Sequence, residues 1–319
     1  MCTVVGFEGK RFFFGRNMDI EGSFGEEIVL VPRRFPLDFC RIAKLEAHYA
    51  VLGMAAVMDG YPLYADGMNE FGLCMAGLNF VGNAYYHSPE IYGERMLAPY
   101  ELIPYILATC KNCEEARLAL EGACLVNVPF RRDVPLSELH WIVADGEGCL
   151  VIESTKSGFH VYDNPSGVLT NNPPFPHQLE NSRLYRHLTE SDPSTNSFFS
   201  LGLGAVGLPG DYSSPSRFVR ASYLREAVMR HGHVDLSTVY RILGAVAPPF
   251  GSVLDRNNQP HYTTYSCCMD PVSRRYTYNT HENHRITTIS MDEWDLSCGG
   301  LHRISIRRSE DLLRETCPS

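Results

Sequence analysis

The chain has 319 residues, 44% hydrophobic and 20% charged, which is the composition of an ordinary globular protein and not of a disordered or collagen-like one. Its formal net charge of −9 and the lack of a Lys/Arg run exclude nucleic acid as a partner, because a phosphate backbone would be repelled. No window reaches the roughly 18 apolar residues of a membrane span, and the start lacks a signal-peptide pattern, so we expect a cytoplasmic protein without a membrane partner.

Strand-like runs separated by Gly- and Asp-rich breaks fill the first quarter of the chain, at residues 3–7, 11–14, 51–58 and 73–78. Pro99 opens a predicted helix over 100–110, and a second helix is expected over 113–120. Residues 139–144 and 149–153 then read as a hairpin around the turn at 145–148.

Two further helices are predicted over 217–229 and 236–245, the latter capped by Asp235 and stopped by Pro248 and Pro249. Strands return at 263–269, 274–280 and 286–290. This order predicts an α+β fold of two sheets with helices segregated outside them, because a doubly wound parallel sheet needs steadier alternation of strands and helices. With no repeat and no long linker, we expect one domain over residues 2–319.

Eleven cysteines, an odd number without a signal peptide, argue against a disulfide framework. Cys110 and Cys113 have CxxC spacing but no second pair at a zinc-like distance, so we favour a structural role over metal or redox work. Cys267 and Cys268 are neighbours in a strand-like run, where side chains alternate between faces, and are expected to be inert.

Cys2 follows Met1 directly, and removal of an initiator methionine is favoured before a small residue. Removal would leave a thiol beside a free α-amine, whose pKa of about 7.7–8.0 lets it accept a proton near neutral pH. A thiol with a neighbouring amine is a nucleophile with its base. The alternative is that Cys2 comes second by chance.

Arg16 and Asp19 come from the far arm of the hairpin that Cys2 begins. If Phe7 pairs with Arg11 across a three-residue loop at Glu8-Gly9-Lys10, Cys2 faces Arg16, whereas a two-residue turn places Gly15 there. A guanidinium beside a thiol favours the thiolate. Asp19 can accept hydrogen bonds from the terminal amine, although an ordinary surface Arg and Asp remain possible.

Two asparagines are candidate donors for the oxyanion of an acyl-transfer reaction. Asn79 ends the run 72–78, and Asn171 lies between an extended segment and proline. Either residue can instead be a plain turn asparagine.

Five stretches together resemble the choloylglycine hydrolase family, which contains bile salt hydrolases and penicillin V acylases with the N-terminal nucleophile fold. They lie in the family's order over nearly the whole chain: Met1-Cys2-Thr3, Phe14-Gly-Arg-Asn-Met-Asp19, Met75-Ala-Gly-Leu-Asn-Phe80, Leu169-Thr-Asn-Asn-Pro173 and Gly207-Leu-Pro-Gly-Asp-Tyr-Ser-Ser-Pro-Ser-Arg-Phe218. The resemblance implies a four-layer αββα sandwich of two antiparallel sheets. It also suggests a homotetramer.

The resemblance implies a role for each matching residue. Cys2 would be the nucleophile with its own amine as base, and Arg16 and Asp19 would position and tune it. The Asn79 backbone amide and the Asn171 side chain would form the oxyanion hole, and Arg217 would support the site electrostatically. No cofactor is implied. Because only Met1 precedes Cys2 here, we expect the ordinary aminopeptidase of the cell to complete maturation.

The substrate implied by the resemblance is a bile acid conjugated to glycine or taurine. Position 79 is Asn, as in bile salt hydrolases, whereas many penicillin V acylases carry Tyr there. The sequence of residues 207–218 also resembles that of the bile-salt members. Arg16 and Asn79 would bind polar parts of the substrate. The apolar candidates for the steroid wall are Met18, Ile20, Phe24 and Ala65.

Three other interpretations stay open. The same mechanism can act on penicillin V or another N-acyl amide. A binding protein that has lost the chemistry is a different class, although the complete set of six polar residues speaks against it. Metal binding by the histidine pairs 231/233 and 281/284 lacks a completing carboxylate or cysteine pattern, so no metal is expected.

Overall fold

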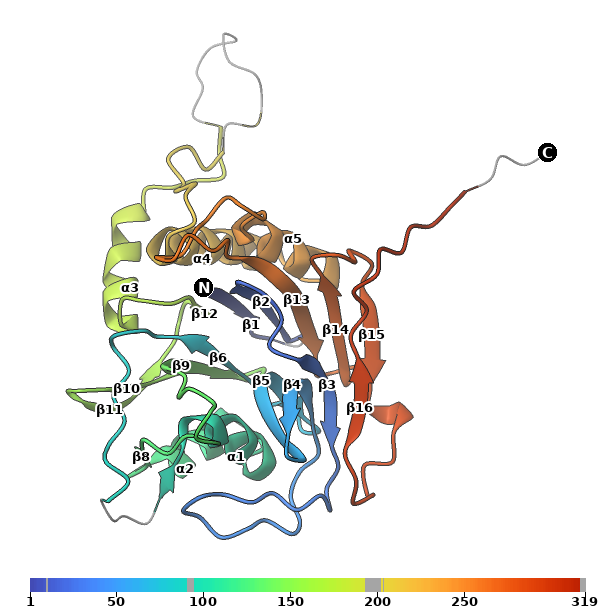
Figure 1. The fold of residues 1–319 in the computed structure, drawn as a ribbon. Helices are drawn as coiled ribbons and strands as arrows, with labels where there is room; N and C mark the ends of the chain where they lie inside the picture. Colours follow the sequence, from blue (N-terminus) through green and yellow to red (C-terminus); the bar gives the residue numbers. More distant parts are fainter. Residues whose placement is uncertain (10, 91–94, 193–201, 203, 316–319) are drawn as a thin grey trace.

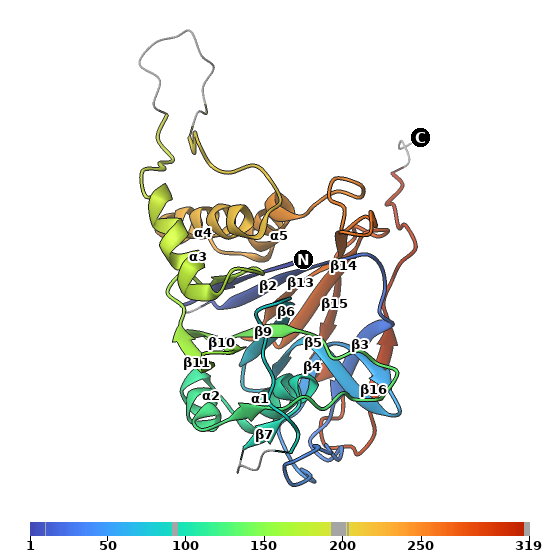
Figure 2. The same ribbon diagram turned by 60° about the vertical axis from the view of Figure 1, so that its left-hand side comes forward.

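The computed structural model describes residues 1–9, 11–90, 95–192, 202 and 204–315, and in this part of the chain two sheets lie face to face with helices outside them (Figures 1 and 2). The N-terminus lies within this layered body, next to β2 (Figure 1). The layers run helix, sheet, sheet, helix, which confirms the predicted αββα sandwich.

The first sheet is antiparallel and carries the N-terminal strand near one edge. Its order is β12 (Val168–Leu169), β1 (Cys2–Phe7), β2 (Phe13–Ile20), β13 (Tyr262–Asp270), β14 (Arg275–Thr280) and β15 (Thr287–Ser290).

The second sheet is also antiparallel, and its order is β11 (Gly158–Asp163), β10 (Cys149–Thr155), β9 (Leu139–Ala144), β6 (Cys74–Asn79), β5 (Tyr61–Asn69), β4 (Val51–Met58), β3 (Glu26–Val31) and β16 (His302–Ser305). A short parallel pair, β7 (Met96–Leu97) with β8 (Cys124–Leu125), lies outside both sheets.

Helices cover the outer face of each sheet. The first sheet is covered by α4 (Ser214–His231) and α5 (Leu236–Val246), and α3 (Phe175–Ser182) packs beside α4. The second is covered by α1 (Leu102–Thr109) and α2 (Cys113–Leu120) (Figure 1). Three short 3-10 turns complete the set: η1 (Pro99–Glu101), η2 (Arg183–Tyr185) and η3 (Met291–Glu293).

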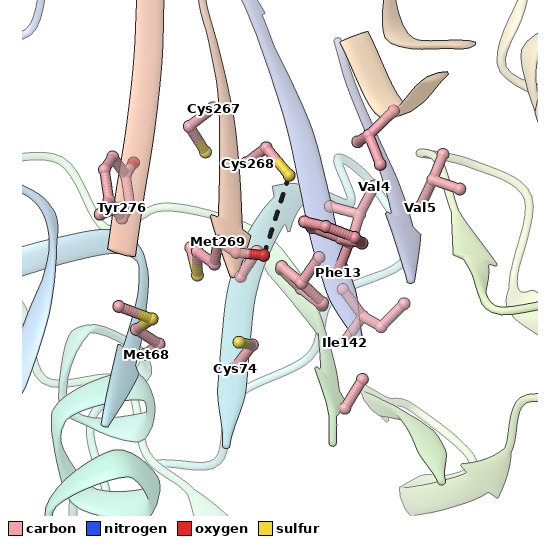
Figure 3. Close-up of a cluster of buried hydrophobic side chains, with 14 of the residues drawn as sticks. Val4, Val5, Phe13, Met68, Cys74, Ile142, Cys267, Cys268, Met269 and Tyr276 are labelled. Carbon is pink, nitrogen blue, oxygen red and sulfur yellow. Dashed lines mark hydrogen bonds between the residues drawn. The ribbon is translucent and has the colours of Figure 1, made fainter. Parts of the chain in front are cut away.

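The core between the sheets is mainly apolar. Figure 3 shows Val4 of the first sheet in one buried cluster with Cys74 and Ile142 of the second. Every residue of β1 is buried, because one face of this strand meets the second sheet and the other meets the helices. Burial on both faces explains why the strand reads as a continuous apolar run without alternation.

The helix boundaries follow their caps. Asn112 accepts a hydrogen bond from the Glu115 nitrogen at 2.9 Å, and Asp235 accepts one from the Thr238 nitrogen at 2.7 Å, which confirms the predicted starts of α2 and α5. The helix expected to begin at residue 217 starts three residues earlier, because Ser213 caps it.

The register of the N-terminal hairpin differs from the prediction. Phe7 pairs with Phe13, so Cys2 lies opposite Met18 and not opposite Arg16. The connection is longer than three residues, because Gly9 takes a positive φ and bonds to Gly146 of another hairpin, and Lys10 of the expected turn lies outside the described residues. The error is two residues, so Arg16 keeps the face that Cys2 occupies.

Candidate active site

Cys2 begins the buried strand β1, and its side chain is 1% exposed. Its Sγ lies 3.6 Å from Arg16 Nη2 and 3.7 Å from Met18 Sδ. Its backbone nitrogen, which is an amide here because Met1 is present, donates to Asn171 Oδ1 at 2.8 Å. Cleavage of the Met1–Cys2 bond would turn this same nitrogen into an α-amine.

Arg16 lies two residues along β2 from the partner of Cys2, on the same face of the sheet. Its Nη1 donates to Asp66 Oδ2 at 2.9 Å and its Nη2 to the Gly77 carbonyl at 2.8 Å. Burial lowers the pKa of Arg16, but Tyr265, Cys2 and Asp66 outweigh this effect and raise it well above its ordinary value. The guanidinium is therefore a permanent cation held beside the sulfur.

Asp19 lies one residue beyond Met18 on β2 and is fully buried. The terminal amine of Met1 donates to its backbone carbonyl, and Thr263 Oγ1 donates to its Oδ1 at 2.6 Å. Burial raises the pKa of this carboxyl, although Arg217 and the terminal amine act in the opposite direction. Its Oδ2 makes no hydrogen bond within the described part of the chain, so it can accept one from an amine at Cys2.

Arg217 reaches the same place from the other layer, on the first turn of α4. Its Nη1 donates to the Cys2 carbonyl and to Thr3 Oγ1, and its Nη2 donates to Asn171 Oδ1 at 2.8 Å. Its Nη1 is 4.0 Å from Asp19 Oδ2. Burial lowers the pKa of this arginine, which the nearby Asp19 and Cys2 partly offset.

The two asparagines meet beside Cys2. Asn171 Nδ2 donates to the Asn79 carbonyl at 2.8 Å, and the Asn171 nitrogen donates to Ser214 Oγ at 2.8 Å. An amide NH₂ group has two donors. One is used on Asn79, so the second can serve another acceptor.

A cavity of about 450 Å³ opens at the sulfur. Every residue that the sequence nominated for substrate contact lies in its wall: Arg16, Met18, Ile20, Phe24, Ala65 and Asn79, together with Cys2 itself. The rest of the wall is mainly apolar and aromatic, with Leu63, Tyr100, Ile103, Phe130, Leu136 and Trp141 among its members. Such a lining suits the apolar half of a ligand.

Sequence reasoning missed two buried polar groups around this site. Asp66 on β5 accepts four hydrogen bonds, one of them from Arg16. His140 on β9 lies 3.0 Å from Glu153 through Nδ1 and 2.8 Å from the Thr170 carbonyl through Nε2, directly before Asn171. The available signal was a charged residue inside an apolar strand-like run, which seldom occurs without a partner.

Apart from Cys2, no cysteine or histidine of the described residues lines this cavity. Every cysteine in the described ranges is free, and Cys110, Cys113, Cys267 and Cys268 are buried. Within those ranges no group of three or more His, Cys, Asp or Glu side chains is arranged to hold a metal ion. His233 instead faces Asp235 at 3.5 Å, and His281 packs on Tyr262. No helix among the described residues has the length and apolarity to span a membrane.

Comparison with known proteins places this arrangement in context. Residues 2–303 match the family of linear amide C–N hydrolases, choloylglycine hydrolase family. The bile salt hydrolase/transferase of Lactiplantibacillus plantarum is 42% identical over 92% of this chain and 93% of its own. The bile salt hydrolase/transferase of Clostridium perfringens is 38% identical over 93% and 94%.

Solved structures of related enzymes have the same fold as this chain. A mutant of the conjugated bile acid hydrolase from Clostridium perfringens superposes with a TM-score of 0.93 at 35% identity, covering 99% of this chain and 100% of the other. The penicillin V acylase from Agrobacterium tumefaciens, at 21% identity and a TM-score of 0.78, shares the fold. The chain is an amide-hydrolysing enzyme with the N-terminal nucleophile fold, and it belongs to the choloylglycine hydrolase family.

Proposed function

We propose that this enzyme cleaves the amide that joins a bile acid to glycine or taurine, with Cys2 as its nucleophile once Met1 is removed. The proposal rests on one observation above all: an apolar cavity of about 450 Å³ ends at the Cys2 sulfur, between a buried cation and two asparagines. A flat apolar acyl group fits the cavity, and its carbonyl then meets the thiol. The relatives named for bile salts support the substrate class.

In the proposed first step the Cys2 α-amine takes the thiol proton, and the sulfur attacks the carbonyl carbon. The Asn79 backbone amide and Asn171 Nδ2 hold the oxyanion that forms. Asn171 Oδ1 accepts hydrogen bonds from the Cys2 nitrogen and from Arg217 Nη2. This one oxygen thereby fixes the amine together with the arginine that holds the Cys2 backbone. The protonated amine then gives its proton to the departing nitrogen as the C–N bond breaks.

In the second step a water molecule loses a proton to the same amine and attacks the thioester. The oxyanion forms again at the same donors and collapses, and the C–S bond breaks. Free bile acid leaves and the thiol regains its proton, so atoms and charges balance over the cycle. No metal or cofactor takes part in this scheme.

Penicillin V and other N-acyl amides with an apolar acyl group are the alternative substrates for the same mechanism. Asn79 favours the bile conjugates in this proposal, because it lines the cavity together with Cys2 and bonds to Asn171, so its side chain can meet the amine half of the substrate. An amide can hydrogen-bond a carboxylate or sulfonate there, which a tyrosine in its place would not reach in the same way.

The test compares glycocholate, taurocholate and penicillin V at equal concentration with enzyme whose mass shows loss of Met1. Release of glycine or taurine at a rate well above penicillin V cleavage supports the proposal, and the reverse order makes the alternative the function. Cys2→Ala must abolish both reactions. Binding of glycocholate without turnover by the Met1-free protein would instead indicate a binding protein.

The expected homotetramer and cytoplasmic location stay predictions. Sedimentation velocity of the purified protein tests the first, because a tetramer has four times the 35.8 kDa mass of the chain. Fractionation of the source cells tests the second.

A further inference from the structure

Asp66 is the most heavily hydrogen-bonded carboxylate beside the active site, and it lies behind Arg16 with no exposed surface. Its Oδ2 accepts from Arg16 Nη1 at 2.9 Å and from the Tyr265 hydroxyl at 2.7 Å. Its Oδ1 accepts from the Tyr276 hydroxyl at 2.6 Å and lies 3.7 Å from the Cys267 thiol. Each oxygen thus has two donors, which fills its acceptor capacity.

The donors reach Asp66 across the sandwich. Asp66 belongs to β5 of the second sheet, whereas Arg16, Tyr265 and Tyr276 belong to three adjacent strands of the first. Figure 3 shows Cys267 and Tyr276 on neighbouring strands of that sheet. The carboxylate therefore joins the two sheets directly behind the arginine that contacts the nucleophile.

The two tyrosines that donate to Asp66 stay protonated. Burial raises the pKa of Tyr265 and of Tyr276 well above the ordinary value, so both keep their O–H groups at physiological pH. Burial acts in the same direction on the Cys267 thiol. Two hydroxyls therefore donate to the carboxylate permanently and draw off part of its negative charge. Asp66 therefore cancels less of the positive electrostatic field that Arg16 exerts at the Cys2 sulfur.

We propose that Asp66, with Tyr265 and Tyr276, is a positioning group that holds Arg16 against Cys2 and sets the pH range in which the Cys2 thiol is reactive. This inference rests on the proposed role of Cys2 as nucleophile. Asp66 does not line the substrate cavity, so its effect passes through Arg16. Among the described residues, Arg217 from α4 also acts on Cys2, and Asp19 of β2 and the terminal amine lie beside that arginine. Glu21 lines the same cavity as Cys2, and Cys74 of β6 lies near Asp66.

The proposal makes two predictions of opposite sign. Asp66→Asn keeps an acceptor for Arg16 but removes a buried negative charge, so alkylation of Cys2 by iodoacetamide should shift to lower pH, by about one unit. Tyr276→Phe removes a donor from the carboxylate without touching Arg16, so the profile should shift upward, by about half a unit. In both variants kcat should change at fixed pH while KM stays within about twofold.

Tyr278→Phe is the matched control. Tyr278 lies two residues from Tyr276 on β14, is equally buried, and accepts a hydrogen bond from the Arg307 nitrogen, but it does not bond to Asp66. This variant has a comparable packing change and should leave the alkylation profile unmoved. Peptide mass spectrometry assigns the label to Cys2, and thermal unfolding identifies any variant that fails to fold.

An unchanged alkylation profile in folded Tyr276→Phe overturns the proposal, as does a shift in the same direction for both variants. If Asp66→Asn does not fold, Tyr276→Phe against Tyr278→Phe still decides the question. Alkylation needs no bile salt, so failure of the substrate assignment leaves this test intact. Failure of Cys2 to react at all in Met1-free protein would instead overturn its role as nucleophile.

Discussion

Asn171 Oδ1 accepts a hydrogen bond from Arg217 Nη2 at 2.8 Å, and the same oxygen accepts from the Cys2 backbone nitrogen at 2.8 Å. One amide oxygen thus fixes the nitrogen that would become the catalytic amine and the arginine that holds the Cys2 carbonyl. One N–H of the same amide group donates to the Asn79 carbonyl, and the other is left for an oxyanion. In the proposed mechanism the side chain of Asn171 would therefore combine orientation of the base with stabilisation of charge.

Asn171→Ala removes both contributions, and we expect kcat to fall by roughly 10²- to 10³-fold or more, the loss usual for one oxyanion donor. Asn171→Asp keeps the acceptor that binds Cys2 and Arg217 but replaces the donor with a second, charged oxygen, so it should lose most turnover, and thermal unfolding checks that it folds. Steady-state hydrolysis of glycocholate measures both. The exposed Asn127→Ala is the control, and near-normal turnover in Asn171→Asp would contradict the oxyanion assignment.

The acidic limb of the pH–rate profile should respond to Asp19. Its carboxyl must be ionised to hold the ammonium of Cys2, and because burial raises its pKa, activity should fall at a higher pH than an ordinary aspartate would give. Thr263→Val removes a hydrogen bond that favours the ionised form. The limb of kcat/KM should therefore move further up in pH.

The control for this prediction is Thr288→Val on β15, two strands away from β13 in the same sheet, where the threonine is exposed. Its pH profile should match that of the unmodified enzyme. If the acidic limb of kcat/KM moves to lower pH in Thr263→Val, the proposed need for an ionised Asp19 is contradicted.

The apolar wall should govern binding more than chemistry. Phe24→Ala removes an aromatic side chain from the cavity and should raise KM for glycocholate about tenfold, equivalent to ~1.4 kcal/mol of lost apolar contact, with a smaller change in kcat. Phe71→Ala, an exposed residue outside the cavity wall, should leave both constants unchanged. Equal KM values for the two variants would remove Phe24 from the substrate wall.

Gly53 controls the approach of β4 to the strand that carries Asp66. A Cβ there would lie 2.1 Å from the Asp66 carbonyl and 2.5 Å from Gly67 Cα, both backbone atoms that cannot turn aside. Gly53→Ala should lower the free energy of unfolding by roughly 1–3 kcal/mol, measured by denaturant titration. Gly244→Ala on the exposed side of α5 meets nothing within 4 Å and should instead raise it by about 0.5–1 kcal/mol.

Mild oxidation should inactivate the enzyme reversibly. Burial raises the pKa of other cysteines, including that of Cys40 to about 12, so they stay as unreactive thiols. Hydrogen peroxide should therefore abolish bile-salt turnover and a thiol reductant restore it, while a chelator changes nothing. Full activity after prolonged peroxide treatment would contradict an accessible thiolate at Cys2.

The sequence predicted the layers and most helices because caps and apolar periodicity are local signals. It missed β3, β5, β11 and β16, and the reasons are visible. β5 contains Pro62 and Gly67, which read as breaks, and β11 is only half-buried and mixes Phe159 and Val161 with His160 and Asp163. Such strands form because their neighbours pair with them, which no short window can reveal.

The structure brings the nominated residues together although the predicted register was wrong. Cys2, Arg16 and Asp19 converge although the assumed turn was two residues wrong, because both pairings keep the same face toward the core. Asp66 could not be found, since its partners come from β2, β13 and β14 and are remote along the chain. Long-range partners of a buried charge require the three-dimensional structure.

Much of the cavity wall comes from segments outside the strands of the first sheet, namely residues 21–24, 56–65, 99–103 and 130–137, whereas Cys2 and Arg16 lie on two adjacent strands of that sheet. Changes in those segments can reshape the acyl pocket while Cys2 and Arg16 stay in place. This separation would let one scaffold diversify toward new acyl amides, and it makes those segments the natural targets for library-based redesign of specificity.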